Sequence, residues 1–141
     1  MKILLIEPEL SELSDKNNFF QWLENNGFTV SVAENTSAAI YKAKSELPDL
    51  IICNIVEVEL DNYYLPKALC EFPTTAIIPL IFAIDKMTQA NIRKTMEMGA
   101  DDCISQSCTE KELLNAIAIR LDRLAFIRQW CTIQASENRF G

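Results

Sequence analysis

The sequence contains no histidine, so its carboxylates and thiols are the first candidates for metal binding or nucleophilic chemistry. Its five cysteines form no C-x-x-C pair, so we do not expect a zinc site of the usual ligand types. Glu57, Glu59 and Asp61 alternate with apolar residues and would share one face of an extended segment. They could hold a cation, but a calcium loop needs glycine and more oxygen ligands at set positions. A solvated acidic loop is therefore the favoured interpretation.

Two of the cysteines, Cys103 and Cys108, lie close enough in the sequence to suggest a redox sensor. A reactive thiol needs a pKa that is lowered by nearby cations. The neighbours of these two cysteines are acidic instead: Asp101, Asp102 and Glu110. We therefore expect ordinary buried or half-buried thiols, and we interpret Asp101 and Asp102 as loop or helix-start charges.

The length and charge of the chain limit the classes of protein to which it could belong. Its 141 residues are 49% apolar, which is enough for one domain with a buried core. A formal charge of −7 has the wrong sign for wrapping a phosphate backbone, so direct nucleic-acid binding is not expected. The apolar run after Lys2 is too short for a signal peptide or a membrane span, and the odd number of thiols fits reducing conditions. We expect a soluble, cytoplasmic protein.

Strand and helix patterns alternate five times along the chain. Apolar or alternating runs predict strands within residues 2–7, 28–34, 50–55, 77–84 and 101–105. Helical spacing, with Thr88 and the Thr109 capping box as starts and Gly27 and Gly99 as stops, predicts helices between them. These helices fall within residues 17–28, 36–49, 65–72, 88–100 and 109–131. Connections of this length require parallel strands with helices on both faces, so we expect a doubly wound α/β fold.

The last predicted helix carries apolar residues on more than one side. One stripe holds Leu114, Ile117, Leu121, Leu124, Ile127 and Cys131, while Phe126 and Trp130 lie on another side. We expect its first half to pack on the sheet and its second half to outrun the domain. The chain then divides into a domain at residues 1–124 and a helical extension with a polar tail at residues 125–141. Dimerisation is the leading explanation for an apolar extension, and continuation into an output domain is the next.

Five short segments carry a resemblance to a known family: "ILLIEPE", "PDLIICNI", "IPLIFAI", "GADDCIS" and the capped last helix. In their order and spacing the sequence resembles the receiver (CheY-like) domain of bacterial two-component response regulators over residues 2–124. The resemblance implies a flavodoxin-like sheet of five parallel strands in the order 2-1-3-4-5, with helices on both faces.

The resemblance also implies where a phosphorylation pocket would lie. In the family, an aspartate at the end of the third strand accepts a phosphoryl group, and an acidic pair after the first strand helps to hold Mg²⁺. A hydroxyl residue ends the fourth strand, and a lysine follows the fifth, three positions after an aromatic switch residue. The corresponding residues here are Asn54, the pair Glu7 and Pro8, Ile84, Gln106 and Cys103.

These departures from the family pattern predict a degenerate pocket. An acyl phosphate needs a carboxylate nucleophile, which the amide of Asn54 is not. Of the three acidic positions that would hold Mg²⁺, Pro8 and Asn54 leave Glu7 as the one carboxylate. Gln106 offers no positive charge and Ile84 no hydroxyl group to a phosphoryl group. We predict no catalytic residue, no metal and no cofactor here.

The function that the resemblance implies is that of a pseudo-receiver: a protein interaction or dimerisation module of two-component signalling that does not respond to aspartyl phosphorylation. The family signals through the face of its fourth and fifth helices and fifth strand. On this chain that face would include Arg93, Met96, Ile104, Leu114, Ile117, Leu121 and Leu124. Two alternatives are a receiver whose vestigial pocket binds a small molecule and a conventional receiver that is phosphorylated elsewhere. A flavodoxin-like redox carrier is a further alternative.

Overall fold

The predicted strands form one parallel sheet. The computed structural model describes residues 1–7, 18–55 and 64–138. The strands are β1 (Lys2–Ile6), β2 (Thr29–Ala33), β3 (Leu50–Ile55), β4 (Leu80–Ile84) and β5 (Asp102–Ser105). They are hydrogen-bonded in the order β2-β1-β3-β4-β5, and every neighbouring pair is parallel. This confirms the doubly wound, flavodoxin-like topology that was predicted.

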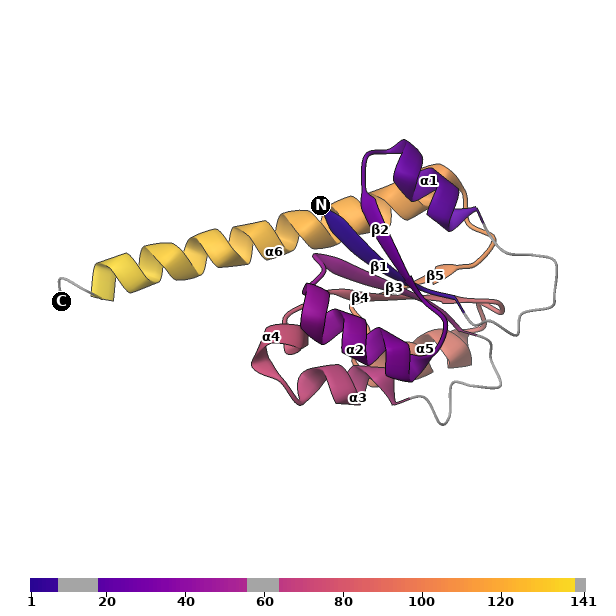
Figure 1. Cartoon of the computed structure of the whole chain (residues 1–141), viewed down its shortest axis with the longest axis horizontal. Coiled ribbons are helices and arrows are strands. Elements are labelled where there is room, and N and C mark those ends of the chain that lie inside the picture. Colours follow the sequence, from indigo (N-terminus) through magenta and orange to yellow (C-terminus); the bar gives the residue numbers. More distant parts are fainter. Residues whose placement is uncertain (8–17, 56–63, 139–141) are drawn as a thin grey trace.

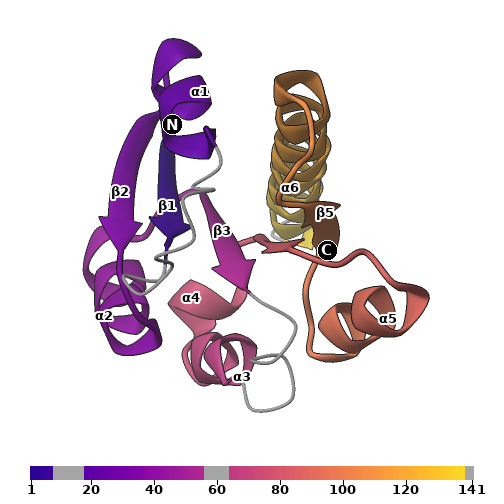
Figure 2. The same ribbon diagram turned by 90° about the vertical axis from the view of Figure 1, so that its right-hand side faces the viewer.

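Helices cover both faces of this sheet. They are α1 (Phe19–Asn25), α2 (Thr36–Glu46), α3 (Leu65–Cys70), α4 (Pro73–Ala76), α5 (Gln89–Glu97) and α6 (Glu110–Asn138). One face carries α1 and α6, and the other carries α2, α3, α4 and α5 (Figure 2). Where one helix was predicted over residues 65–72, the chain begins a second short helix at Pro73. The separation arises because Phe72, which precedes this proline, is extended (φ −123°, ψ 130°).

The core is divided between the two faces by the alternation of side chains along the strands. On β1, Ile3 and Leu5 pack with α1 and α6, whereas Leu4 and Ile6 pack with the helices of the opposite face. Every residue of β3 and β4 is buried, as expected of central strands that are covered on both sides. A register slip of one residue would move all of these side chains to the wrong face. The apolar packing on the two faces of the sheet therefore fixes the register of each strand.

Helix ends lie where the capping residues predicted them. Oγ1 of Thr88 accepts a hydrogen bond of 3.1 Å from the backbone N–H three residues further on, and Oγ1 of Thr109 accepts the equivalent bond of 3.2 Å. Gly27 and Gly99 lie just beyond α1 and α5 with φ of +86° and +105°, where glycine is favoured. The threonine side chain that precedes each helix therefore caps the N-terminus of α5 and of α6.

The last helix, α6, is much longer than the sheet that it covers. It begins beside β5, crosses the face that it shares with α1, and continues past the edge at which β1 begins (Figure 1). Its 29 residues correspond to about 43 Å, whereas a strand of five residues spans about 17 Å. Despite this length α6 is not apolar enough to cross a bilayer, and neither is any other helix in the described part of the chain.

Candidate functional site

The carboxyl ends of four neighbouring strands bring the predicted pocket residues to one edge of the sheet. Asn54 lies opposite Ala83, and Ile84 lies opposite Ile55 in the β3–β4 register. Glu7 directly follows β1, the neighbour of β3, and Gln106 directly follows β5. Open α/β sheets bind ligands at this edge. Pro8 lies outside the described residues.

At the predicted phospho-acceptor position, Asn54 is the second-last residue of β3 and is 9% exposed. The flanking residues Cys53 and Ile55 are buried in the apolar core, so the register places the Asn54 amide at the point where the core meets the sheet edge. An amide oxygen is neutral, and the lone pair of the amide nitrogen is delocalised. This side chain can hydrogen-bond, but it cannot attack phosphorus as a carboxylate would.

Gln106 holds the ends of three strands together. Its Nε2 donates hydrogen bonds of 3.1 Å to the carbonyl oxygens of Ile55 and Ala83, which belong to β3 and β4. Its backbone N–H donates to the carbonyl oxygen of Ile84 at 3.0 Å. A neutral amide therefore binds main-chain oxygens at the position where the family has a cationic lysine. The sequence predicted the missing charge, but it contained no signal for these partners because they are backbone atoms.

Ile84 occupies the position at which the family has a hydroxyl residue, and its side chain is apolar. It is fully buried and belongs to the same apolar cluster as Phe82 and Ile55, on the face that α2, α3, α4 and α5 cover. It therefore contributes to the core and offers no polar atom to the sheet edge.

The predicted switch position, Cys103, is half-buried against this same cluster. Burial raises the pKa of its thiol from the usual 9.0, a hydrogen bond with the Thr95 side chain lowers it, and the charge of Asp102 raises it. The net effect is upward, which keeps the thiol protonated and poorly nucleophilic at neutral pH. The pKa of Cys108 is also raised, chiefly by burial. These thiols are of the ordinary kind that was expected, whereas Cys70 is exposed.

The acidic residues of "GADD" have structural partners. Oδ2 of Asp101 accepts a hydrogen bond of 2.7 Å from the backbone N–H of Leu80, and the Asp101 N–H donates to the Leu80 carbonyl at 2.8 Å. Oδ1 of Asp102 accepts from the Cys103 N–H, and its Oδ2 lies 3.9 Å from Arg120. Asp102 is the first residue of β5, so the helix-start interpretation is wrong for it.

No cluster of metal-ligating side chains occurs in the described part of the chain. Within residues 1–7, 18–55 and 64–138, no three His, Cys, Asp or Glu side chains are close enough together to hold an ion. Glu57, Glu59 and Asp61, whose alternation first suggested a cation site, lie outside the described residues.

The residues predicted for an interaction face divide between surface and core. Arg93 and Met96 are exposed on α5, and Oε1 of Glu97 accepts a hydrogen bond of 3.2 Å from Nε of Arg93. The half-buried members of the predicted face are Ile104, Leu114, Leu121 and Leu124. Ile117 is 1% exposed, because its side chain lies on the side of α6 that packs against the sheet.

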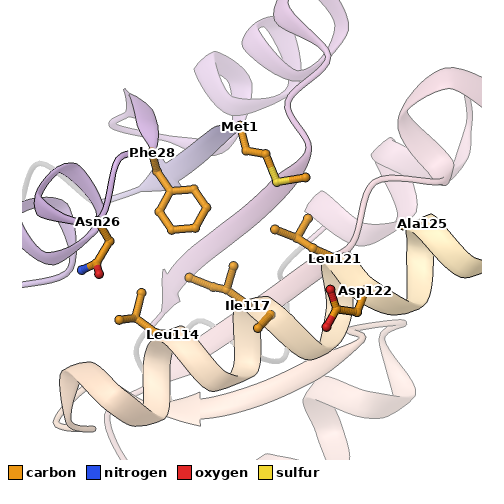
Figure 3. A pocket seen from close by; sticks show the side chains of 9 residues that line it. Met1, Asn26, Phe28, Leu114, Ile117, Leu121, Asp122 and Ala125 are labelled. Atoms are coloured by element: carbon orange, nitrogen blue, oxygen red, sulfur yellow. The ribbon is translucent and has the colours of Figure 1, made fainter.

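Two grooves, which the sequence did not predict, run along the two flanks of α6, and the first of them is mainly apolar. The first, here the Phe28 groove, has a volume of about 480 Å³. In it the side chains of Phe28, Leu114, Ile117 and Leu121 converge, with Asp122 near one end (Figure 3).

The second groove, here the Met96 groove, has a volume of about 540 Å³ and lies between α4, α5 and α6. Its lining combines apolar side chains with charged ones: Ile77, Met96, Leu124 and Ile127 beside Asp101, Arg120 and Arg123. Neither groove is lined by any of the predicted pocket residues at the sheet edge.

Comparisons with known proteins identify the family. The family model for the response regulator receiver domain matches residues 14–118. Protein PilH of Pseudomonas aeruginosa is 26% identical over 116 residues, which are 82% of this chain and 93% of PilH. The alkaline phosphatase synthesis transcriptional regulatory protein PhoP of Bacillus subtilis is 27% identical over 113 residues, which are 79% of this chain but 45% of PhoP.

The solved structures agree with this result. The crystal structure of a response regulator from Desulfuromonas acetoxidans superposes with a TM-score of 0.73 at 25% identity, covering 87% of this chain and 98% of that one. The family match, the topology and the position of the strand-end residues are mutually consistent. The chain belongs to the family of response regulator receiver domains of two-component signalling.

Proposed function

We propose that this receiver domain acts without an aspartyl phosphate, as a protein interaction module of two-component signalling. The observation that carries the proposal is the presence of two neutral amides, Asn54 and Gln106, at the carboxyl ends of β3 and β5. Asn54 provides no carboxylate nucleophile, and the Gln106 amide donates to two main-chain oxygens, Ile55 O and Ala83 O, at 3.1 Å.

The other residues of this edge support the same proposal. The Ile84 side chain is buried hydrocarbon, so it cannot hydrogen-bond a phosphoryl oxygen. Glu7 is the one carboxylate among the described pocket residues, and Mg²⁺ prefers several hard oxygen ligands in octahedral geometry. The pocket therefore lacks the nucleophile, the charge clamp and most of the metal ligands together.

Partner binding replaces phosphorylation as the control in this proposal. A receiver without an aspartyl phosphate can be shifted between conformations by a partner that binds one of them better. The Met96 groove offers exposed apolar side chains, those of Ile77, Met96 and Ile127, on the face through which the family signals. Exposed apolar side chains gathered in this way are typical of protein-binding surfaces. The free thiols that the structure describes fit a cytoplasmic setting.

The first alternative, a small molecule in the vestigial pocket, has less support. The Gln106 amide is already bound to the main-chain oxygens of Ile55 and Ala83. The second alternative is a conventional receiver that is phosphorylated at another residue. Incubation with a phosphodonor distinguishes it directly from a receiver that is not phosphorylated.

Intact mass after incubation with acetyl phosphate and Mg²⁺ tests phosphorylation independence. We expect the mass of the wild-type chain to stay unchanged. A matched variant that combines Asn54→Asp, Ile84→Thr and Gln106→Lys rebuilds the family residues, and a receiver with an intact pocket serves as the positive control for the phosphodonor. A phosphoryl group on the wild-type chain would contradict the proposal.

Affinity purification from the source cell tests the interaction surface. Met96→Asp should reduce the recovery of a partner, because it places a charge among the exposed apolar side chains of Ile77 and Ile127. Tyr41→Asp changes an exposed apolar side chain on α2 that does not line this groove, and it should leave recovery unchanged. Equal recovery with wild type and Met96→Asp would exclude the Met96 groove as the binding surface.

A further inference from the structure

The Phe28 groove is hollow because large and small side chains alternate along one stripe of α6. Leu114 and Leu121 lie on this stripe, two turns apart, and both are half-buried. Ala118 and Ala125 each follow one of these leucines by one turn, and both are exposed. The space that larger side chains would fill at the two alanines therefore stays open to the solvent.

The wall opposite this stripe comes from the N-terminal part of the chain. The side chains of Met1 and Phe28 face the leucines of α6 across the groove (Figure 3). Asn26 lines one end, where its Nδ2 donates a hydrogen bond of 3.0 Å to Oε1 of Glu110. This bond joins the two walls, because Asn26 caps the C-terminus of α1 and Glu110 is the first residue of α6. The groove is therefore already formed without a ligand, and its walls are mainly apolar.

Asp122 is the one ionisable side chain among the described residues that line the Phe28 groove. It is exposed and lies near one end of the groove (Figure 3). Its neighbours three and four positions away on α6 are all uncharged: Ala118, Ile119, Ala125 and Phe126. No ion pair joins Asp122 to another described side chain. Its negative charge is therefore available to a cation that enters the groove.

We propose that the Phe28 groove binds a small amphiphilic amine, with its apolar group between Phe28 and the leucines of α6 and its protonated amine beside Asp122. The groove volume of about 480 Å³ falls within the range of small-molecule sites, about 300–1,000 Å³. Nine described residues line it, whereas a protein interface uses about 20–30 residues on each side. An aromatic ring in the ligand can stack on the Phe28 ring. Size and charge together therefore favour a small cationic ligand over a protein partner.

This site is separate from both of the sites on which the proposed function rests. Met1 precedes β1 and Phe28 precedes β2, so the groove lies at the amino ends of these strands. The predicted phosphorylation pocket lies at the carboxyl ends of the strands instead. The described residues that line the Phe28 groove and those that line the Met96 groove have no member in common. The inference therefore goes beyond the proposed function.

Titration of the full chain with three matched probes, followed by NMR chemical shifts, tests the inference. The probes are naphthylethylamine, naphthylethanol and naphthylacetate, which share one ring system and are respectively cationic, neutral and anionic at neutral pH. We expect the amine to bind about threefold more tightly than the alcohol and about tenfold more tightly than the carboxylate. These differences are modest because Asp122 is exposed and water screens its charge.

Variants of α6 separate the charge of the groove from its shape. Asp122→Asn should give the amine and the alcohol equal affinities, and Asp122→Lys should make the carboxylate the tightest probe. Glu112→Gln removes an exposed charge of α6 that does not line the groove, so it should leave the preference for the amine unchanged. Ala118→Trp fills the groove and should abolish binding of all three probes. Ile119→Trp places the same side chain at an exposed position outside the groove and should leave binding unchanged.

Several results would overturn the inference. They are no binding of any probe at millimolar concentration, equal affinities of wild type for the amine and the alcohol, a preference for the amine that persists in Asp122→Asn, and binding that survives in Ala118→Trp. Circular dichroism establishes that each variant is folded, and the Asp122 variants test the charge even if Ala118→Trp does not fold. The inference and the proposed function fail separately: absence of amine binding refutes only the ligand site, whereas a phosphorylated wild-type chain refutes only phosphorylation independence.

Discussion

Replacing Gln106 with alanine removes the two hydrogen bonds that its Nε2 donates to the carbonyl oxygens of Ile55 and Ala83. A hydrogen bond between neutral groups contributes about 0.5–1.5 kcal/mol net to stability, so two contribute about 1–3 kcal/mol. Gln106 is half-buried, and water can reach part of the site in the variant. We therefore expect a loss near the lower end, about 1–2 kcal/mol.

Two further substitutions at the same position separate the hydrogen bonds from simple packing. The ammonium of Gln106→Lys can still donate to both carbonyl oxygens, so this variant should lose less stability than Gln106→Ala. The carboxylate of Gln106→Glu can only accept at neutral pH, and it would face two other acceptors. Gln106→Glu should therefore be the least stable of the three despite its similar size.

Urea unfolding followed by circular dichroism measures these differences. With an m value of about 1.5–2 kcal/mol per molar urea, a loss of 1–2 kcal/mol lowers the midpoint by roughly 0.5–1 M. Gln21→Ala is the matched control, because Nε2 of Gln21 donates a 3.0 Å bond to Asn25 on the exposed side of α1. Its midpoint should barely move. The reasoning is refuted if Gln106→Ala behaves like this control or if Gln106→Glu is more stable than Gln106→Ala.

Three other predictions concern a cap, a strand contact and the thiols. Thr88→Ala should destabilise the fold by about 1 kcal/mol in the same assay, because α5 loses its N-cap bond, whereas Thr88→Ser should retain most of it. Asp101→Ala should lower the free energy of unfolding by about 1.5–3 kcal/mol, because it removes the charge-assisted hydrogen bond from the Leu80 N–H. Asp101→Asn should lose less stability, because its amide oxygen can still accept this bond. Equal losses in the two variants would contradict this reasoning. With a thiol reagent at pH 8, exposed Cys70 should react well before Cys103, whose raised pKa leaves less thiolate; faster reaction of Cys103 would show that burial does not control it.

The fold could be predicted from the sequence because its local signals agree with one another. The unbroken apolar run at residues 50–55 requires cover on both faces, and β3 is buried throughout. Thr88, Gly99 and Thr109 mark helix ends by chemistry that acts within a few residues, so no tertiary information was needed. The second helix beginning at Pro73 was missed, although Pro73 itself was the available signal.

The chemistry of the candidate site was predictable only as a set of residue types. The absence of a carboxylate at Asn54 and of a cation at Gln106 follows directly from the sequence. The partners of Gln106 do not, because they are the carbonyl oxygens of Ile55 and Ala83, and every residue has a carbonyl oxygen. What decides which carbonyls it meets is the register of β3 and β4 at their ends, which is a tertiary property.

For α6, the sequence could not indicate which side of the helix faces the core. Apolar residues occur nearly all the way around this helix, so no single stripe in the sequence identifies the core side. The sheet resolves the ambiguity where it is present: it buries Ile117 and leaves Ile119 exposed. Past the sheet edge, Phe126 on the outer side of α6 is exposed, so no element in the described part of the chain buries it. Which side of α6 belongs to the core is therefore set by the position of the sheet and not by the pattern of apolar residues along the helix.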